Sequence, residues 1–240
     1  IKATYGTGSS VMAPLSTPDT RITTLATTVA WHDGAHAVYG LEGNIPHTGD
    51  GLAWMLQATG ISTLSEIQRV ALLQSLPDSI PSTDGVYFVP ALTGSGAPWW
   101  DDKARGIICG LSRGSGPAHL VRAALEAIAY QIADVIEAMK QHPDFHLNTL
   151  MVDGGPTRNH WLMQFQADLL GCPVARSTTA ELSALGAGLL ARKVLSGLDD
   201  DALLPLLPEH ELWQPDMVRH AQLQDSYLGW REAVARAHWK

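Results

Sequence analysis

The clue to the fold lies in residues 150–159, Leu150-Met151-Val152-Asp153-Gly154-Gly155-Pro156-Thr157-Arg158-Asn159. The first three residues form an apolar run that is typical of a strand, and a helical pattern follows at residues 160–170. Between the two, consecutive glycines let the backbone turn sharply. In α/β sheets, ligands gather where strands end and helices begin. The stretch therefore predicts a strand–turn–helix unit whose turn can hold a ligand.

The same alternation of strand and helix continues on both sides of this stretch. Further strands are predicted at residues 86–89, 106–111 and 174–175, and further helices at 117–139, 180–195 and 217–239. Apolar residues recur at steps of three and four along 117–139, which predicts a core helix of about six turns. The pattern predicts an α/β fold with a mixed sheet covered by helices on both faces.

The N-terminal part is predicted to begin with strands. A strand at 22–30, a turn at His32-Asp33-Gly34 and a return strand at 37–41 favour an antiparallel meander. Two helices follow. Thr48 or Asp50 is expected to cap the first, and Thr63 with Glu66 predicts a capping box for the second, at 63–76.

Two glycine turns are the candidate ligand sites. In Tyr5-Gly6-Thr7-Gly8-Ser9-Ser10, glycines let the backbone approach a phosphate and hydroxyls add donors, although a tight hairpin turn explains the same residues. In the second, Gly154 and Gly155 let a flat ligand lie against the backbone, and Asn159 can bond a base or ribose. The alternative there is a plain turn with Asn159 as the helix cap. Neither turn is followed by the GK[ST] of a Walker loop.

Composition excludes several classes of protein. Among 240 residues, 45% are hydrophobic and 17% charged, as in globular domains. The net charge of −8 and the scattered Lys and Arg argue against nucleic-acid binding, and no apolar run approaches the roughly 18 residues of a membrane span. Cys109 and Cys172 lie in apolar runs without a CxxC partner, which predicts reduced cysteines in a cytoplasmic protein. The chain is not expected to be a Ser-His-Asp hydrolase, and His119 is expected at a helix start in a surface or capping role.

The chain begins at Ile1 inside a predicted strand, without an initiator Met or signal peptide, so we expect it to be a piece of a longer protein. Trp99 and Trp100 can stack on a ligand, but buried or interface packing is the favoured interpretation.

Several motifs, in order, resemble the C-terminal domain of the FGGY carbohydrate kinases, and within that family the glycerol kinases. The most specific is Gly106-Ile107-Ile108-Cys109-Gly110-Leu111 followed, after seven residues, by His119-Leu120-Val121-Arg122-Ala123-Ala124-Leu125-Glu126. The others are Thr4-Tyr5-Gly6-Thr7-Gly8, residues 84–91, residues 93–100, Val152-Asp153-Gly154-Gly155 with Asn159, residues 162–166, residues 184–187 and Tyr227-Leu228-Gly229-Trp230. The resemblance covers nearly the whole chain.

The resemblance implies that residues 1–240 form one ribonuclease-H-like (actin-like ATPase) domain, the C-terminal nucleotide-binding half of the kinase. The absent N-terminal domain would bind the sugar or polyol and supply the catalytic Asp, so this chain holds no catalytic residue and is expected to be inactive alone. By position, Gly6 and Thr7 are expected near the phosphates and Gly49 in the nucleotide site. Gly155 and Asn159 are expected at the adenosine portion, with Gly154 beside them. ATP and Mg²⁺ are the implied cofactors.

Two positions depart from the glycerol kinase pattern. Ser10 stands where those enzymes place a Phe that walls the glycerol pocket, and Ala53 stands where they place a Gln near the nucleotide. A hydroxyl in place of an aromatic wall makes room for a longer or more polar substrate. Glycerol is the first expectation, with a xylulose-type pentose or another polyol as the alternative, and a non-catalytic actin-like module as the rival of another class. The resemblance leaves a homo-oligomer open and predicts no nucleic-acid or membrane partner.

Overall fold

A computed structural model describes residues 1–32, 36–143, 145–179, 182–199 and 201–238. Within these ranges, one sheet has the strand order β3-β4-β2-β1-β7-β8-β9, and β5 pairs with β6 separately. The large sheet contains β1 (Lys2–Tyr5), β2 (Ser9–Leu15), β3 (Ala26–His32), β4 (Ala37–Ile45), β7 (Leu150–Asp153), β8 (Val174–Ser177) and β9 (His210–Trp213). The small sheet contains β5 (Tyr87–Val89) and β6 (Ile107–Cys109). Because β7 runs parallel to both β1 and β8 while the other pairs are antiparallel, the predicted mixed sheet is confirmed.

The α-helices follow the predicted pattern closely. They are α1 (Gly49–Ala58), α2 (Glu66–Ser75), α3 (Pro117–Met139), α4 (His160–Leu170), α5 (Leu182–Ser196) and α6 (Met217–Ala237). Short 3₁₀ turns occur at η1 (Ile61–Thr63), η2 (Leu76–Ser79), η3 (Gly155–Arg158) and η4 (Leu204–Leu206). Pro117 opens α3 at the position that favours proline, and the His119 ring accepts a hydrogen bond from the Gly116 amide (3.2 Å), which confirms the capping role expected of His119.

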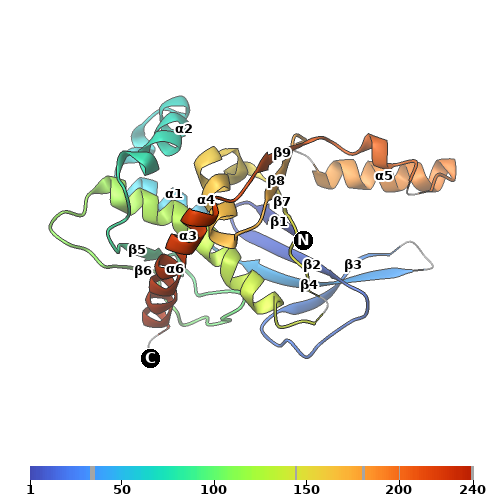
Figure 1. Ribbon diagram of the computed structural model, residues 1–240, viewed down its shortest axis with the longest axis horizontal. Helices are drawn as coiled ribbons and strands as arrows, with labels where there is room; N and C mark the ends of the chain where they lie inside the picture. Colours follow the sequence, from blue (N-terminus) through green and yellow to red (C-terminus); the bar gives the residue numbers. More distant parts are fainter. Residues whose placement is uncertain (33–35, 144, 180–181, 200, 239–240) are drawn as a thin grey trace.

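Helix α3 forms the centre of the core. It packs against α1, α4, β2 and β5, and 17 of its residues are buried. Alternate residues of β2 and β4 turn toward it, among them Val11, Ala13 and Leu41. Figure 1 shows α3, α4 and α6 gathered together and α5 lying apart from them. Helix α5 has no buried residue in the part described, and its Lys193 ammonium lies 5.6 Å from the ring centre of Trp31 in β3.

The predicted antiparallel pairing of the third and fourth strands is confirmed, but the N-terminal strands do not form the predicted meander. In a meander β3 would lie between β2 and β4, but β4 pairs with β2 and β3 lies outside β4. The burial pattern gives the reason. Strands β2 and β4 each have a buried apolar face against the core, whereas β3 is exposed or half-buried throughout, so it occupies the edge. The predicted turn at residues 32–34 falls partly on residues outside those described.

One further expectation about local structure is wrong, and one strand was missed. The capping box of α2 is formed by Ser65 and Gln68, whereas Thr63 belongs to η1, because the chain first makes a 3₁₀ turn after Gly60. Strand β9 was not predicted. Its side chains are mostly exposed, so no apolar alternation marks it in the sequence, and it forms by pairing with β8.

Candidate nucleotide site

The two glycine turns predicted from the sequence meet at one edge of the sheet. Strands β1 and β7 are parallel neighbours, with Thr4 opposite Asp153, so the turns that follow them leave the sheet side by side. Gly154 has φ of +100°, and a Cβ added there would overlap the carbonyl oxygen of Tyr5. Only glycine combines this backbone conformation with so close an approach. Gly154 is therefore what allows the second turn to lie against the first.

The first turn is held in place by the start of α1. The amides of Thr48 and Asp50 donate to the Thr7 carbonyl, each at 3.1 Å, and the Gly49 amide donates to the Gly6 carbonyl at 3.0 Å. A Cβ at position 49 would overlap that same Gly6 oxygen. Gly49 thus lies beside the turn, and its amide already has a partner there. The structure makes it a support for the turn, while Thr7 is exposed to solvent.

Beneath the turn, Tyr5 anchors the end of β1. Its hydroxyl donates to Gln166 Oε1 of α4 (2.8 Å), and burial raises the pKa of Tyr5 well above its usual range, so the phenol stays neutral. Ser9 adds a hydroxyl–hydroxyl bond to Thr48 (2.8 Å). The residues flanking Gly6-Thr7-Gly8 are thereby fixed from both sides.

Asn159 caps α4, which is the alternative that the sequence left open. Its Oδ1 accepts from the Leu162 amide (2.9 Å), and its Nδ2 donates to the Leu73 carbonyl of α2 (2.9 Å). Both ends of the side chain therefore bond to protein. Asn159 fixes the start of α4 and joins it to α2 directly after the second glycine turn.

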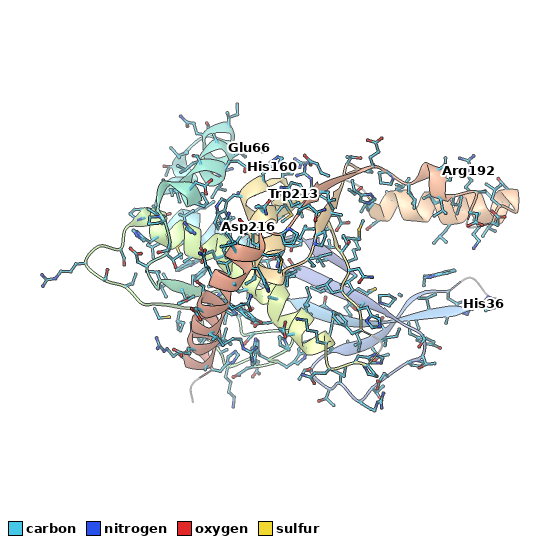
Figure 2. The ribbon with its side chains drawn as sticks, in the orientation of Figure 1. His36, Glu66, His160, Arg192, Trp213 and Asp216 are labelled. Carbon is cyan, nitrogen blue, oxygen red and sulfur yellow. The ribbon has the colours of Figure 1, made fainter. Side chains whose placement is uncertain are left out.

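Helix α2 and η2 form an arm that packs beside this turn. Gln74 of α2 donates to the Arg158 carbonyl (2.9 Å) and accepts from the His160 amide (3.1 Å). In η2, Asp78 accepts from the Trp161 indole (3.0 Å). The ring of His160, the first residue of α4, lies 5.7 Å from the ring of Trp213 in β9, edge to face (Figure 2). These hydrogen bonds join the arm to the start of α4.

A hollow of about 620 Å³ opens beside the second turn, within the size range of small-molecule sites. Gly154 and Gly155 line it, while Gly6, Thr7, Gly49 and Asn159 do not. Asp153, which belongs to the Val152-Asp153-Gly154-Gly155 motif, also lines it. The sequence interpretation missed the rest of the wall, which contains Thr157, Arg158, Arg176, Ser177, Thr178, Thr179 and Glu211. A signal was present: residues 176–179 are a polar run directly after an apolar strand, at the sheet edge where ligands bind.

Comparison with known proteins supports the sequence resemblance. Residues 1–193 match the C-terminal domain of the FGGY family of carbohydrate kinases. The chain belongs to this family. It is 52% identical over 238 residues to the apulose kinase of Pectobacterium atrosepticum and 42% identical over 242 residues to the glycerol kinase of Thermococcus gammatolerans. These matches cover 99% of this chain but 46% and 47% of the relatives, so the chain spans about half the length of the curated relatives it matches.

Solved structures of FGGY kinases have the same fold. The glycerol kinase of Plasmodium falciparum, crystallised with ADP, superposes with a TM-score of 0.82 at 28% identity, covering 100% of this chain and 47% of that one. A gluconate kinase from Lactobacillus acidophilus gives a TM-score of 0.84 at 20% identity, covering 99% of this chain and 47% of that one. The predicted actin-like ATPase fold of this FGGY domain is confirmed.

The family signature in α3 has a structural role in this FGGY domain. Arg122 donates to Glu126 Oε1 (2.8 Å) and to the carbonyls of Pro77 (2.8 Å) and Ile80 (2.6 Å). Both charged residues are buried, and the guanidinium lies 5.3 Å from the ring centre of Trp161. The pair thus fastens the η2 end of the arm to the core.

The two departures from the glycerol kinase pattern lie on the surface of the FGGY domain. Ala53 is exposed on α1. Ser10 is half-buried, and its hydroxyl donates to Glu42 Oε1 (2.9 Å). Because the hydrogen of Ser10 is engaged, its oxygen remains as an acceptor for a ligand hydroxyl.

Among the described residues, no cluster of three His, Cys, Asp or Glu side chains is arranged to hold a metal, and no helix is long and apolar enough to cross a membrane. Asp153 has one carboxylate oxygen 3.0 Å from the Lys2 ammonium, and its other oxygen is buried without a hydrogen-bond partner. A single free carboxylate oxygen fits Mg²⁺ that is carried mainly by ATP phosphates and water, as this ion prefers. Cys109 and Cys172 are free thiols, as predicted.

Proposed function

We propose that this FGGY domain is the nucleotide-binding half of an ATP-dependent carbohydrate kinase that transfers the γ-phosphoryl group of ATP to a hydroxyl of a small ketose. The main support is the close packing of Gly154 against the Tyr5 carbonyl, because it brings the two glycine turns together at one edge of the sheet. The likeness to a glycerol kinase crystallised with ADP adds to it.

In this proposal each turn holds one part of ATP. Gly6 and Thr7 face the phosphates, with Gly49 and the start of α1 fixing the conformation of their turn. Gly154 and Gly155 lie against the adenosine, and Asn159 positions α2 at its border. Mg²⁺ would arrive with ATP and neutralise phosphate charge, with Asp153 as the nearby carboxylate.

The absent half completes the reaction. Phosphoryl transfer needs a carboxylate to orient the attacking hydroxyl, and we assign that group and most of the sugar contacts to the N-terminal domain. Closure of two domains would exclude water, so that transfer to the sugar outcompetes hydrolysis. This chain alone is then expected to bind nucleotide without turnover.

Two observations favour a ketose over glycerol as the acceptor. The 52% identical relative is an apulose kinase, whereas the glycerol kinase from Thermococcus gammatolerans is 42% identical. Ser10 also replaces a bulky wall by a small hydroxyl that can accept a hydrogen bond from a further substrate hydroxyl. Glycerol is retained as the second candidate because its kinases match 99% of the chain.

The test is a kinetic comparison on the full-length enzyme. Apulose, xylulose and glycerol would each be supplied with MgATP, and both ADP and the phosphorylated product would be measured. We expect kcat/KM for a ketose to exceed that for glycerol by about tenfold or more, the discrimination that one polar contact provides. Equal or better use of glycerol would reject the ketose assignment. No phosphorylated product from any carbohydrate would favour a non-catalytic nucleotide-binding module.

A further inference from the structure

Two consecutive tryptophans in the loop between β5 and β6 have different surroundings. Trp99 packs toward α6, with the Arg231 guanidinium 5.1 Å and the His238 ring 5.6 Å from its ring centre. Trp100 is 53% exposed, although tryptophan is the largest apolar side chain. Packing within this domain therefore accounts for Trp99 but does not account for Trp100.

Trp100 is nevertheless held in one place. Its backbone has φ of +48°, a conformation that residues other than glycine adopt rarely, and its amide donates to the Gly96 carbonyl (2.8 Å). The indole Nε1 donates to the Thr24 carbonyl (2.6 Å), 76 residues away in the sequence. Ser95 and Asp101 close the loop with two backbone hydrogen bonds, of 2.8 and 3.1 Å. Unusual backbone conformations of this kind cluster at functional sites, because the surrounding structure must maintain them.

Trp100 lines a hollow of about 380 Å³ whose accessible surface is mainly apolar, with a few polar groups at one side. The polar groups come from a row across three strands: Thr4 in β1 lies opposite Ser10 in β2, and Ser10 lies opposite Asn44 in β4. Directly opposed residues project from the same face of a sheet. Ile45 and Pro46 add apolar surface. A mainly apolar wall that includes an aromatic ring, with a few hydroxyl and amide groups beside it, suits a small molecule that presents a C–H face and some O–H groups.

The hollow also adjoins the proposed phosphate turn. Gly8 and Ser9, which follow Thr7 directly, form part of its wall. A molecule bound there would lie next to the phosphate end of the nucleotide. This is the position that a phosphoryl acceptor must occupy.

We propose that Trp100 is a specificity-determining residue for the carbohydrate acceptor. Its indole ring packs on the C–H face of a small, neutral ketose, while Thr4, Ser10 and Asn44 bond to the hydroxyls of the sugar. This inference rests on the proposed function, since it assigns the acceptor side of the same site. Glycerol is shorter than a ketose of five carbons and would leave most of the ring without a contact, so the ring selects the larger acceptor.

The experiment uses the full-length enzyme with Trp100→Ala, Trp100→Phe and, as a matched control, Leu228→Ala. Leu228 is 63% exposed on α6, so its replacement also removes exposed apolar surface, but it does not line the hollow. KM and kcat would be measured for apulose, xylulose, glycerol and ATP, together with the melting temperature of each variant.

For Trp100→Ala we expect KM for the preferred ketose to rise about tenfold, the effect of losing one aromatic contact, with KM for ATP within about twofold of wild type. The preference for that ketose over glycerol should fall by a similar factor, because glycerol makes little contact with the indole ring and its KM should change little. Trp100→Phe should restore most of the ketose affinity, since it keeps an aromatic face. Leu228→Ala should match wild type.

Three results would overturn the inference. The first is an unchanged ketose KM in Trp100→Ala. The second is an equal rise of both KM values with a lower melting temperature, which would mean that Trp100 instead packs against the N-terminal half. The third is a wild-type enzyme that phosphorylates no carbohydrate. That result is visible without any variant, and it removes the proposed function and this inference together.

Discussion

Replacement of Arg122 by methionine is expected to destabilise the FGGY domain strongly, although Arg122 belongs to neither glycine turn. Methionine keeps an apolar side chain against Trp161 and removes only the charge and its donors. Glu126 would then be left buried with the Tyr130 hydroxyl (3.2 Å), and the carbonyls of Pro77 and Ile80 would lose their donor. Removing one partner of a buried ion pair costs about 3–5 kcal/mol.

This cost translates into a measurable change in thermal stability. For a domain of this size, 1 kcal/mol shifts the melting temperature by about 2–4 °C, so Arg122→Met should lower it by about 6–20 °C. Burial already raises the pKa of Glu126, against the lowering effect of Arg122. Without Arg122 the pKa of Glu126 should rise further. The loss of melting temperature in Arg122→Met should therefore become smaller as the pH falls and Glu126 takes up a proton. Differential scanning fluorimetry of the full-length enzyme between pH 5 and pH 8 would measure both effects.

The double variant Arg122→Met, Glu126→Gln is the control. It removes both charges, so no uncompensated charge stays buried, and it should recover a large part of the lost stability. KM for ATP should rise in the single variant, because the arm formed by α2 and η2 borders the second glycine turn through Asn159. A melting temperature within about 2 °C of wild type in the single variant, or a double variant that is the less stable of the two, would refute the reasoning.

Three further predictions concern the site and the core. Asn159→Asp keeps the helix cap and loses the donor to Leu73, whereas Asn159→Ala loses both and should lower the free energy of unfolding by about 1 kcal/mol more. Calorimetric titration of both variants with ADP will separate the capping role from a role in binding. Wild-type affinity for ADP in Asn159→Asp would exclude an essential contact between the Asn159 amide group and the nucleotide. Gly154→Ala should lower the free energy of unfolding by about 1–3 kcal/mol because of its positive φ alone, and by more because of the overlap with Tyr5. It should raise KM for ATP as well as lower the melting temperature. Unchanged kinetics would argue against the turn as a nucleotide site. Burial raises the pKa of Asp134 from 3.8 to about 6, against the hydrogen bonds from Trp230 and Tyr227 that lower it. The resulting stabilisation is present below about pH 4 and is lost as the pH rises through 6. When the pH is lowered from 7.5 to 4.5, the wild-type protein should therefore gain stability relative to Asp134→Asn. A difference in melting temperature that does not change with pH would contradict the raised pKa.

Much of the fold could be predicted because its signals are local. The 117–139 and 160–170 helices begin and end where the apolar spacing and flanking residues place them. The two glycine turns were found for the same reason, since a strand followed by glycines can be read within ten residues. Strand β9 and the capping box of α2 were missed because their local signals were weak or had a competing interpretation.

The sequence by itself therefore determined the α/β class, the long core helix, the glycine turns and, through ordered motifs, the FGGY family. The tertiary structure alone decided how these parts meet. It placed β3 outside β4, joined Asn159 to Leu73 across 86 residues, and separated a packed Trp99 from an exposed Trp100. Helical period and capping act over a few residues, so a single sequence displays them. Contacts between distant segments depend on which apolar faces are buried together, and only the packed structure fixes that choice.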